Sequence, residues 1–183
     1  VHPDDALAGE RHNGSKGKTE MWYVVQADEK AHLMSGLTRQ ITPEEYAAKV
    51  EDNTITDVLH DYNVAAGDVF FLPAGRIHSI GTGCFIAEIQ QTSDITYRIY
   101  DFGRVGLDGK PRELHTELSK AAIDYTVLED YKTSYEDVKN AENEIVSCEY
   151  FTTSIYDLTE KAQADVKAND SFLIVICVEG QGC

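Results

Sequence analysis

The amino-acid sequence predicts a mainly β protein, folded as a β barrel or jelly roll with a short helical insertion. Short runs of apolar and aromatic residues recur along the chain and are separated by turn-forming residues, which is the pattern of antiparallel strands. Hydrophobic residues make up 42% and charged residues 26% of the 183, the composition of a globular protein. A chain of this length forms one or two domains of on the order of 150 residues each.

The order of the elements follows from the positions of the apolar runs and the helix signals. Thr42 is a typical N-cap and Pro43 suits a first helical position, so a helix is expected there. A second short helix is expected from Thr54, which makes a helical insertion over about residues 42–62. A further helix is expected from Thr116. The expected strands are residues 21–25, 31–37, 69–72, 84–89, 96–102, 145–154 and 171–178.

The charge and the cysteine content of the sequence limit which partners and which cellular compartment are expected. Lys and Arg number 16 against 32 Asp and Glu, so the net charge is −16 and the average surface repels a polyanion. We therefore expect no nucleic-acid partner, and a small anionic ligand only where cations gather locally. No run of 18 apolar residues occurs, so no membrane partner is expected. The four cysteines show no C-x-x-C spacing and indicate free thiols in the cytoplasm: Cys84, Cys148, Cys177 and Cys183.

The most specific stretch of the sequence runs from Gly67 to His78 with the spacing G-x5-P-x-G-x2-H. Pro73 and Gly75 end one strand in a tight turn, and His78 then begins the next strand with its side chain directed into the barrel. This spacing is that of the second sequence motif of cupin barrels. We expect His78 to be a metal ligand; a histidine buried for packing alone is the alternative.

A metal ligand needs partners, and His2 and Glu20 are the best candidates to join His78. Two imidazoles and one carboxylate suit Zn²⁺, with Fe²⁺, Mn²⁺ or Co²⁺ as alternatives. The long separations in sequence are expected when ligands come from different strands of one barrel. We therefore predict that the three side chains converge on one metal site.

Four sequence blocks, in this order, resemble those of type I mannose-6-phosphate isomerases, and are most similar to the short bacterial branch of this cupin family. They are HPDD at residues 2–5, GKTEMWY at 17–23, PAGRIH at 73–78 and QQTSDITYRIYD at 90–101. The resemblance implies a metal-binding cupin domain, a double-stranded β-helix, over residues 1–125. It also implies a connector over residues 126–144 and the truncated start of a second cupin domain over residues 145–183. We expect the chain to be an internal fragment of a longer protein.

The resemblance also implies an activity and the residues that carry it. Family members interconvert mannose 6-phosphate and fructose 6-phosphate with one zinc ion, so a sugar phosphate is the expected substrate. The family's metal ligands correspond to His2, Glu20 and His78, and a further glutamine ligand would precede Val1. Its catalytic arginine, active-site lysine and neighbouring acid correspond to Arg98, Lys18 and Asp94.

The chemistry of aldose–ketose isomerisation agrees with these residues. The reaction needs a base, an electrophile for the developing oxyanion and an anchor for the phosphate. Lys18 and Arg98 are cations suited to an enediolate or a phosphate. Arg104 is a candidate phosphate contact or a surface ion-pair residue. The base stays open between Asp94, His78 and a metal-bound water. His115 either lines the same cleft or caps the next helix.

Two other functions are compatible with a cupin fold, which by itself hosts many chemistries. One is a non-catalytic cupin that binds sugar phosphates or regulates; the presence of Lys18 and Arg98 disfavours it. The other is an Fe²⁺ dioxygenase, disfavoured because its usual closely spaced His-x-His is missing. The oligomeric state does not follow from the sequence.

Overall fold

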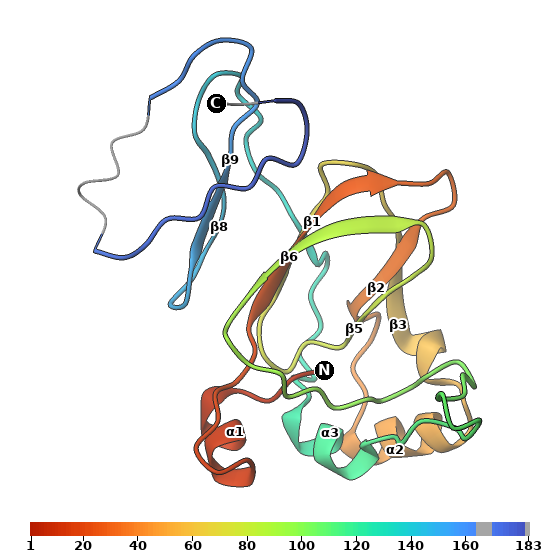
Figure 1. Ribbon diagram of the computed structural model, residues 1–183. Coiled ribbons are helices and arrows are strands. Elements are labelled where there is room, and N and C mark those ends of the chain that lie inside the picture. Colours follow the sequence, from red (N-terminus) through yellow and green to blue (C-terminus); the bar gives the residue numbers. More distant parts are fainter. Residues whose placement is uncertain (164–169, 182–183) are drawn as a thin grey trace.

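The computed structural model describes residues 1–163 and 170–181, and it confirms the mainly β, jelly-roll fold (Figure 1). One sheet has the strand order β6-β1-β4-β7 and a second has the order β3-β2-β5. All neighbouring strands run antiparallel. The first sheet comprises β1 (Glu20–Ala27), β4 (Val69–Leu72), β6 (Cys84–Gln90) and β7 (Lys132–Thr133); the second comprises β2 (His32–Leu37), β3 (Leu59–Asn63) and β5 (His78–Ile80).

Strand β1 is buried on both of its faces. Trp22 and Val24 point inward and pack with Leu33 of the second sheet, so this cluster fills the space between the sheets. Met21, on the opposite face, packs instead against Ile145 of strand β8 (Asn143–Ser147). A strand covered on both faces needs apolar residues at successive positions, which explains the unbroken apolar run at residues 21–25.

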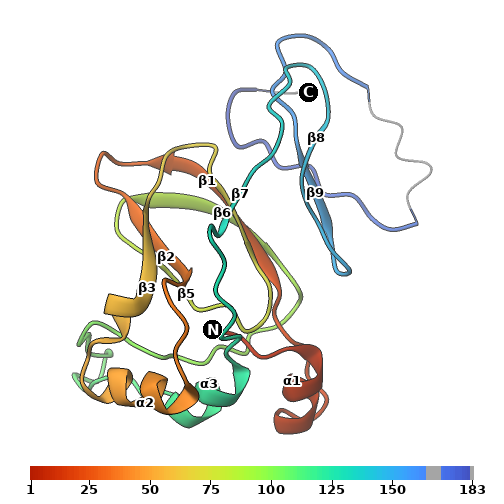
Figure 2. The same ribbon diagram turned by 180° about the vertical axis from the view of Figure 1, so that it is seen from behind.

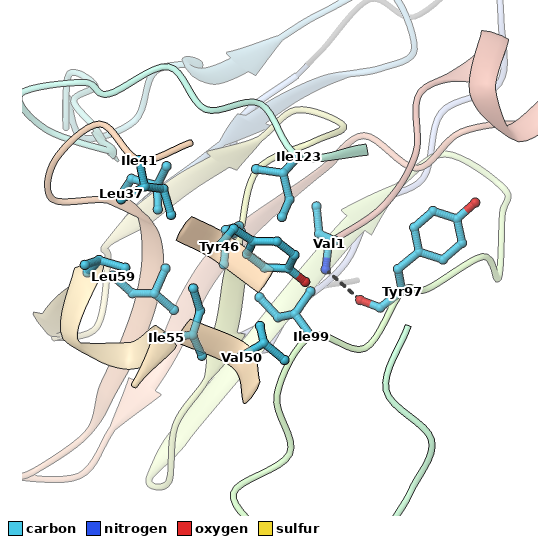
Figure 3. Close-up of a cluster of buried hydrophobic side chains, with 12 residues drawn as sticks. Val1, Leu37, Ile41, Tyr46, Val50, Ile55, Leu59, Tyr97, Ile99 and Ile123 are labelled. Carbon is cyan, nitrogen blue, oxygen red and sulfur yellow. Dashed lines mark hydrogen bonds between the residues drawn. The ribbon is translucent and has the colours of Figure 1, made fainter. Parts of the chain in front are cut away.

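The helices gather at one end of the barrel, where α2 and α3 lie side by side (Figures 1 and 2). Helix α2 (Pro43–Glu51) begins as predicted, because the Thr42 side chain accepts a hydrogen bond from the amide of Glu45. Its buried residue Tyr46 joins a cluster from other elements that includes Leu37, Ile55, Ile99 and Ile123 (Figure 3). Among the described residues no helix has the length and apolar character needed to cross a bilayer.

One local prediction near the helices was wrong, and one helix was missed. The helix expected from Thr54 is one 3₁₀ turn, η1 (Ile55–Val58), followed by β3, because this segment gains main-chain hydrogen bonds by pairing with β2. Helix α1 (Asp5–Arg11) was not predicted, although Asp4 is its N-cap and accepts from the amide of Leu7. The expected helix from Thr116 is α3 (Thr116–Ala122).

Two expected strands are absent from the described residues. Residues 96–102 form no sheet ladder, because the amide of Tyr97 donates to the Val1 carbonyl (3.0 Å) and Phe102 has a φ of 52°, outside the extended region. Residues 171–178 form no strand either, and their apolar side chains are exposed. A single strand without a partner would leave its backbone donors and acceptors unpaired, so the segment does not gain by forming a regular strand.

Residues after α3 contribute to both sheets and to a separate hairpin. The buried Tyr131 hydroxyl donates to the Leu37 carbonyl (2.9 Å), and its ring covers Gly36, while β7 pairs with β4. The predicted connector 126–144 therefore packs on the two sheets. Strands β8 and β9 (Thr152–Ile155) pair with one another and, among described residues, with no other strand. The boundary at residue 145 stays a prediction.

The turn at Pro73–Gly75 positions the strand that carries His78. Gly75 has a φ of 87°, a conformation that glycine adopts readily and other residues avoid. Its amide donates to the carbonyl of His2 (2.8 Å) and its carbonyl accepts from the amide of Asp124 (2.9 Å). This backbone contact leaves no space for a side chain, because a Cβ on Gly75 would lie 2.8 Å from the carbonyl oxygen of Ala122.

Substitution of Gly75 should distinguish the cost of lost space for close packing from the cost of backbone strain. We expect Gly75→Ala to lower the free energy of unfolding by about 2–4 kcal/mol, through strain and a forced shift of the chain after α3. Gly14→Ala is the matched control, because Gly14 has a φ of 84° with nothing within 4 Å of its added Cβ. It should cost about 1 kcal/mol. Urea unfolding measures both, and equal losses would contradict the packing argument.

Candidate functional site

Three side chains from distant parts of the sequence meet at one end of the barrel. Glu20 is the first residue of β1, His78 is the first residue of β5, and His2 lies in the extended segment before α1. The Nε2 atoms of the two histidines are 3.2 Å apart. The Glu20 carboxylate lies 3.5 Å from Nε2 of His2 and 3.3 Å from Nε2 of His78. The structure thus brings together the three residues that the sequence proposed as metal ligands.

Burial controls the charge of these groups. The side chains of His2, Glu20 and His78 are 5%, 1% and 9% exposed. Burial lowers the pKa of His2 to about 3 and lowers the pKa of His78 well below its ordinary value, so both imidazoles are neutral at pH 7. Burial also raises the pKa of Glu20 to about 7, with the nearby Glu88 carboxylate acting in the same direction.

A hydrogen bond on the far side of the ring orients His2. Its Nδ1 lies 2.8 Å from the carbonyl oxygen of Ile95, and a carbonyl can only accept, so Nδ1 carries the proton. In a neutral imidazole the lone pair is then on Nε2, which faces Glu20 and His78. This arrangement of backbone carbonyl, imidazole and open lone pair is typical of histidines that ligate metals.

The geometry of the three donor atoms fits a metal ion. Tetrahedral coordination with bonds of about 2.0–2.2 Å places ligand atoms about 3.3–3.5 Å apart. The two Nε2 atoms are 3.2 Å apart, Glu20 Oε1 is 3.3 Å from Nε2 of His78, and Glu20 Oε2 is 3.5 Å from Nε2 of His2. Nitrogen, nitrogen and oxygen are the donors that zinc and similar ions accept. The residues present therefore fit a divalent cation in both position and chemistry.

Lys18 lies beside this group and is held by two carboxylates. Its Nζ is 3.0 Å from Glu20 and 3.2 Å from Glu88 on β6. Burial opposes its charge, but the two carboxylates outweigh that effect and the pKa of Lys18 is raised. Glu88 is fixed in turn by the indole N–H of Trp22, which donates to it at 3.0 Å from the adjacent position on β1. The Lys18 side chain is therefore protonated, and the two carboxylates fix its position.

These groups open into one cavity of about 300 Å³, a volume suited to a small molecule. One part of the cavity wall is formed by the three candidate metal ligands and Lys18. Another part is formed by residues from the irregular segment after β6. That segment contributes Arg98, Arg104 and Arg112, so most cations near the cavity come from one stretch of chain. An acidic protein thus gathers positive charge around this cavity.

Arg98 is held by the segment that precedes α3. Tyr97 and Ile99 on either side are buried, and Arg98 lines the cavity. Its backbone amide donates to Nδ1 of His115 (2.9 Å), and its guanidinium donates to the carbonyl of Glu113 (3.0 Å). Of the two roles weighed for His115, the helix role is confirmed by position: His115 is the N-cap residue of α3, although its side chain makes no cap hydrogen bond, and it is not in the cavity wall. The His115 ring also accepts the hydrogen bond from Arg98.

Some site residues differ from the sequence predictions. Asp94 is exposed and is not in the wall of the cavity, so the structure does not bring it to the other candidates. Arg104 is in the wall and is paired with Asp101 (2.8 Å). Glu88 and Arg112 were missed. Glu88 could have been noticed in the sequence, because it is a charged residue inside the apolar strand run at residues 84–89. Its partner on β1, however, depends on the register of the sheet.

Comparison with known proteins finds curated relatives that are similar to the chain throughout its length. The curated mannose-6-phosphate isomerase ManA of Bacillus subtilis is 34% identical over 184 aligned residues, covering 100% of this chain and 58% of the relative. Mannose-6-phosphate isomerase of Streptococcus mutans is 36% identical over 183 residues, with 57% of it covered. The chain thus spans under two thirds of these relatives. The family described as "Mannose-6-phosphate isomerase, cupin domain" matches residues 141–183.

Solved structures agree with this relationship. The crystal structure of mannose 6-phosphate isomerase from Bacillus subtilis superposes with a TM-score of 0.74 at 34% identity, covering 83% of this chain and 49% of that one. A variant of phosphomannose isomerase from Salmonella typhimurium superposes at 0.65 with 12% identity over 88% of this chain and 59% of that one, a likeness of fold. The chain is a cupin protein. Along its whole length the chain is similar to curated mannose-6-phosphate isomerases, the proteins that its motifs resemble.

The hydrogen bond to Ile95 makes a prediction about the His2 ring. In the metal-free protein at pH 7, His2 should be neutral with its proton on Nδ1, because burial disfavours the imidazolium and the carbonyl requires a donor. Long-range ¹⁵N–¹H spectra of the histidine rings distinguish the tautomers. His32, which is 38% exposed, is the comparison residue. A proton on Nε2, or a charged ring, would contradict the proposed orientation.

Proposed function

We propose that the protein containing this chain is an aldose–ketose isomerase that interconverts mannose 6-phosphate and fructose 6-phosphate with the aid of a divalent metal ion, zinc being the preferred assignment over iron, manganese or cobalt. The observation that carries the proposal is the convergence of His2, Glu20 and His78 beside Lys18 and Arg98 in one cavity. Relatives named mannose-6-phosphate isomerases support the substrate class.

The reaction requires a proton to leave C2 of the aldose and arrive at C1, while a hydroxyl proton moves from O2 to O1. The intermediate is an enediol or enediolate, whose negative oxygen must be stabilised. His2, Glu20 and His78 would hold the metal, which when bound supplies Lewis-acid polarisation of a sugar oxygen. The cavity excludes bulk water from the three donors, since each of their side chains is less than 10% exposed.

Lys18 and Arg98 would act on the oxygens of the sugar. Lys18 is a protonated donor held at the edge of the metal site, so it can hydrogen-bond to an oxygen that becomes negative. Arg98 is always charged and presents a planar fork that can donate two parallel hydrogen bonds to an enediolate or phosphate. Asp94 has no role in this proposal because it is exposed away from the cavity.

We also infer that the protein works in the cytoplasm. Its thiols support this, because Cys84, Cys148 and Cys177 form no disulfide in the structure; Cys183 is outside the described residues. Free cysteines are usual in reducing compartments.

Loss of a ligand should remove the metal. The intact protein is expected to bind one zinc per chain. Glu20→Gln or His78→Gln should weaken zinc binding by on the order of 10²-fold or more, because the first replaces an anionic ligand with a neutral amide and the second removes an imidazole. His32→Gln is the control, since His32 lies on the surface beside Asp61. Chelator competition followed by elemental analysis measures the affinity. Unchanged zinc affinity in both ligand variants would overturn the metal assignment.

The guanidinium of Arg98 should matter for turnover rather than for metal binding. Arg98→Ala and Arg98→Lys should each lose roughly 10²-fold or more in kcat for mannose 6-phosphate, the scale of one lost oxyanion donor. Lysine keeps the positive charge but lacks the planar guanidinium that donates two parallel hydrogen bonds, so Arg98→Lys should not restore turnover. Zinc content should stay normal. Turnover within a few-fold of the parent would remove Arg98 from the mechanism, and lost zinc would make its role structural.

A further inference from the structure

Both backbone polar groups of Arg98 are bonded to a single residue, His115. The amide of Arg98 donates to Nδ1 of the His115 ring (2.9 Å), and the carbonyl of Arg98 accepts from the amide of His115 (2.7 Å). In an antiparallel β pair, two residues exchange N–H···O=C bonds in a similar way. Here the imidazole nitrogen takes the place of one carbonyl oxygen. The guanidinium of Arg98 also donates to the carbonyl of Glu113 (3.0 Å), so residues 113–115 hold Arg98 at three points.

The bond to Nδ1 fixes the tautomer of the His115 ring. A backbone amide can only donate, so Nδ1 of His115 must present a lone pair, and the proton of the neutral ring is on Nε2. An imidazolium carries a proton on both nitrogens and could not accept this bond. His2 has the opposite tautomer, because its Nδ1 donates to the carbonyl of Ile95. The ring of His115 is thus prepared to bind a backbone amide, and that of His2 to present a lone pair to a metal.

The place of His115 at the start of α3 supports a role other than helix capping. It is the N-cap residue, a position where Ser, Thr, Asp and Asn are preferred because their side chains accept from the first amides of the helix. The His115 side chain makes no such bond. Its ring lies beside the ring of Tyr97 instead, with centroids 6.2 Å apart, and the Tyr97 hydroxyl is 2.7 Å from Nε2 of His12. The His115 ring therefore serves the segment that carries Arg98 and not the helix.

We propose that His115 is a positioning residue for Arg98 and directs its guanidinium into the cavity. Arg98 lines the cavity and His115 does not, so His115 acts through Arg98 and not on the substrate. Residues 96–102 form no sheet ladder, so no neighbouring strand fixes the direction of the Arg98 side chain. A catalytic group displaced by about 1 Å can lose on the order of 10²-fold in rate. The inference rests on the proposed function where it concerns turnover.

Two substitutions of similar shape separate the acceptor from the ring. Asparagine has an amide oxygen close to the place of Nδ1, whereas leucine has no acceptor. In the intact, metal-loaded protein, His115→Leu should lower kcat for mannose 6-phosphate about tenfold and leave KM within about twofold, because a misdirected guanidinium loses contacts made in the transition state. His115→Asn should restore most of the turnover. His32→Leu is the control, since Nδ1 of His32 is bonded to Asp61 at the surface.

A double variant and a measurement without substrate test whether His115 acts through Arg98. In an Arg98→Ala background, His115→Leu should lower kcat no further, because the effects of residues that act through one another do not add. Hydrogen exchange of the Arg98 backbone amide reports the contact itself. This amide should be protected in the parent and in His115→Asn, and should exchange about tenfold faster or more in His115→Leu.

The results distinguish the positioning role from the proposed function. Long-range ¹⁵N–¹H spectra of the parent need no variant, and a proton on Nδ1 of His115 would overturn the proposal. A parent-like kcat in His115→Leu would also overturn it, as would a tenfold loss from this substitution in the Arg98→Ala background. Low turnover in His115→Asn with a protected Arg98 amide would do the same. A parent that does not isomerise mannose 6-phosphate, but whose Arg98 amide loses protection only in His115→Leu, would reject the proposed function and support the positioning of Arg98.

Discussion

The main chain of Gly75 joins three parts of the molecule that are far apart in sequence. Its amide binds the carbonyl of His2, its carbonyl binds the amide of Asp124 after α3, and three residues later the chain reaches His78. The two imidazoles, 76 residues apart, meet because one turn is bonded to both of their segments. The contact is made by backbone atoms at a spacing that excludes a Cβ, so it depends on glycine and not on any side-chain chemistry.

Burial creates an electrostatic problem that a cation would solve. Glu20 is 1% exposed, and taking a carboxylate out of water is costly unless it is paired. Lys18 offsets part of this cost, but Lys18 is shared with Glu88, and the pKa of Glu20 is still raised to about 7. The neutral imidazoles of His2 and His78 add donors without adding charge. A divalent ion would favour the ionised form of Glu20 and use the lone pair on Nε2 of His2.

Local signals in the sequence predicted most elements, and long-range pairing accounts for most of the failures; helix α1 was missed although its cap at Asp4 is a local signal. The cap at Thr42 and the turn before His78 depend on a few adjacent residues, so helix α2 and strand β5 could be expected. Residues 96–102 look like a strand, but their donors bind Val1 and His115, which no local pattern reveals. The same limit applies to the site. His2, Glu20 and His78 belong to recognisable motifs, whereas Glu88 and Arg112 are placed by partners distant in sequence.

The irregular backbone after β6 is what allows its charged residues to face one cavity. In a strand, side chains alternate between two faces, so residues three apart point in opposite directions. Arg98, Asp101 and Arg104 are spaced by three, yet all of them line the same cavity. A regular strand here would turn Asp101 away from the arginine on either side. The segment makes no sheet ladder. Hydrogen bonds to Val1 and His115 hold it instead, together with the ion pairs of Arg104 and Arg112 with Asp101. The charged side chains that line the cavity therefore also help to fix the shape of the segment.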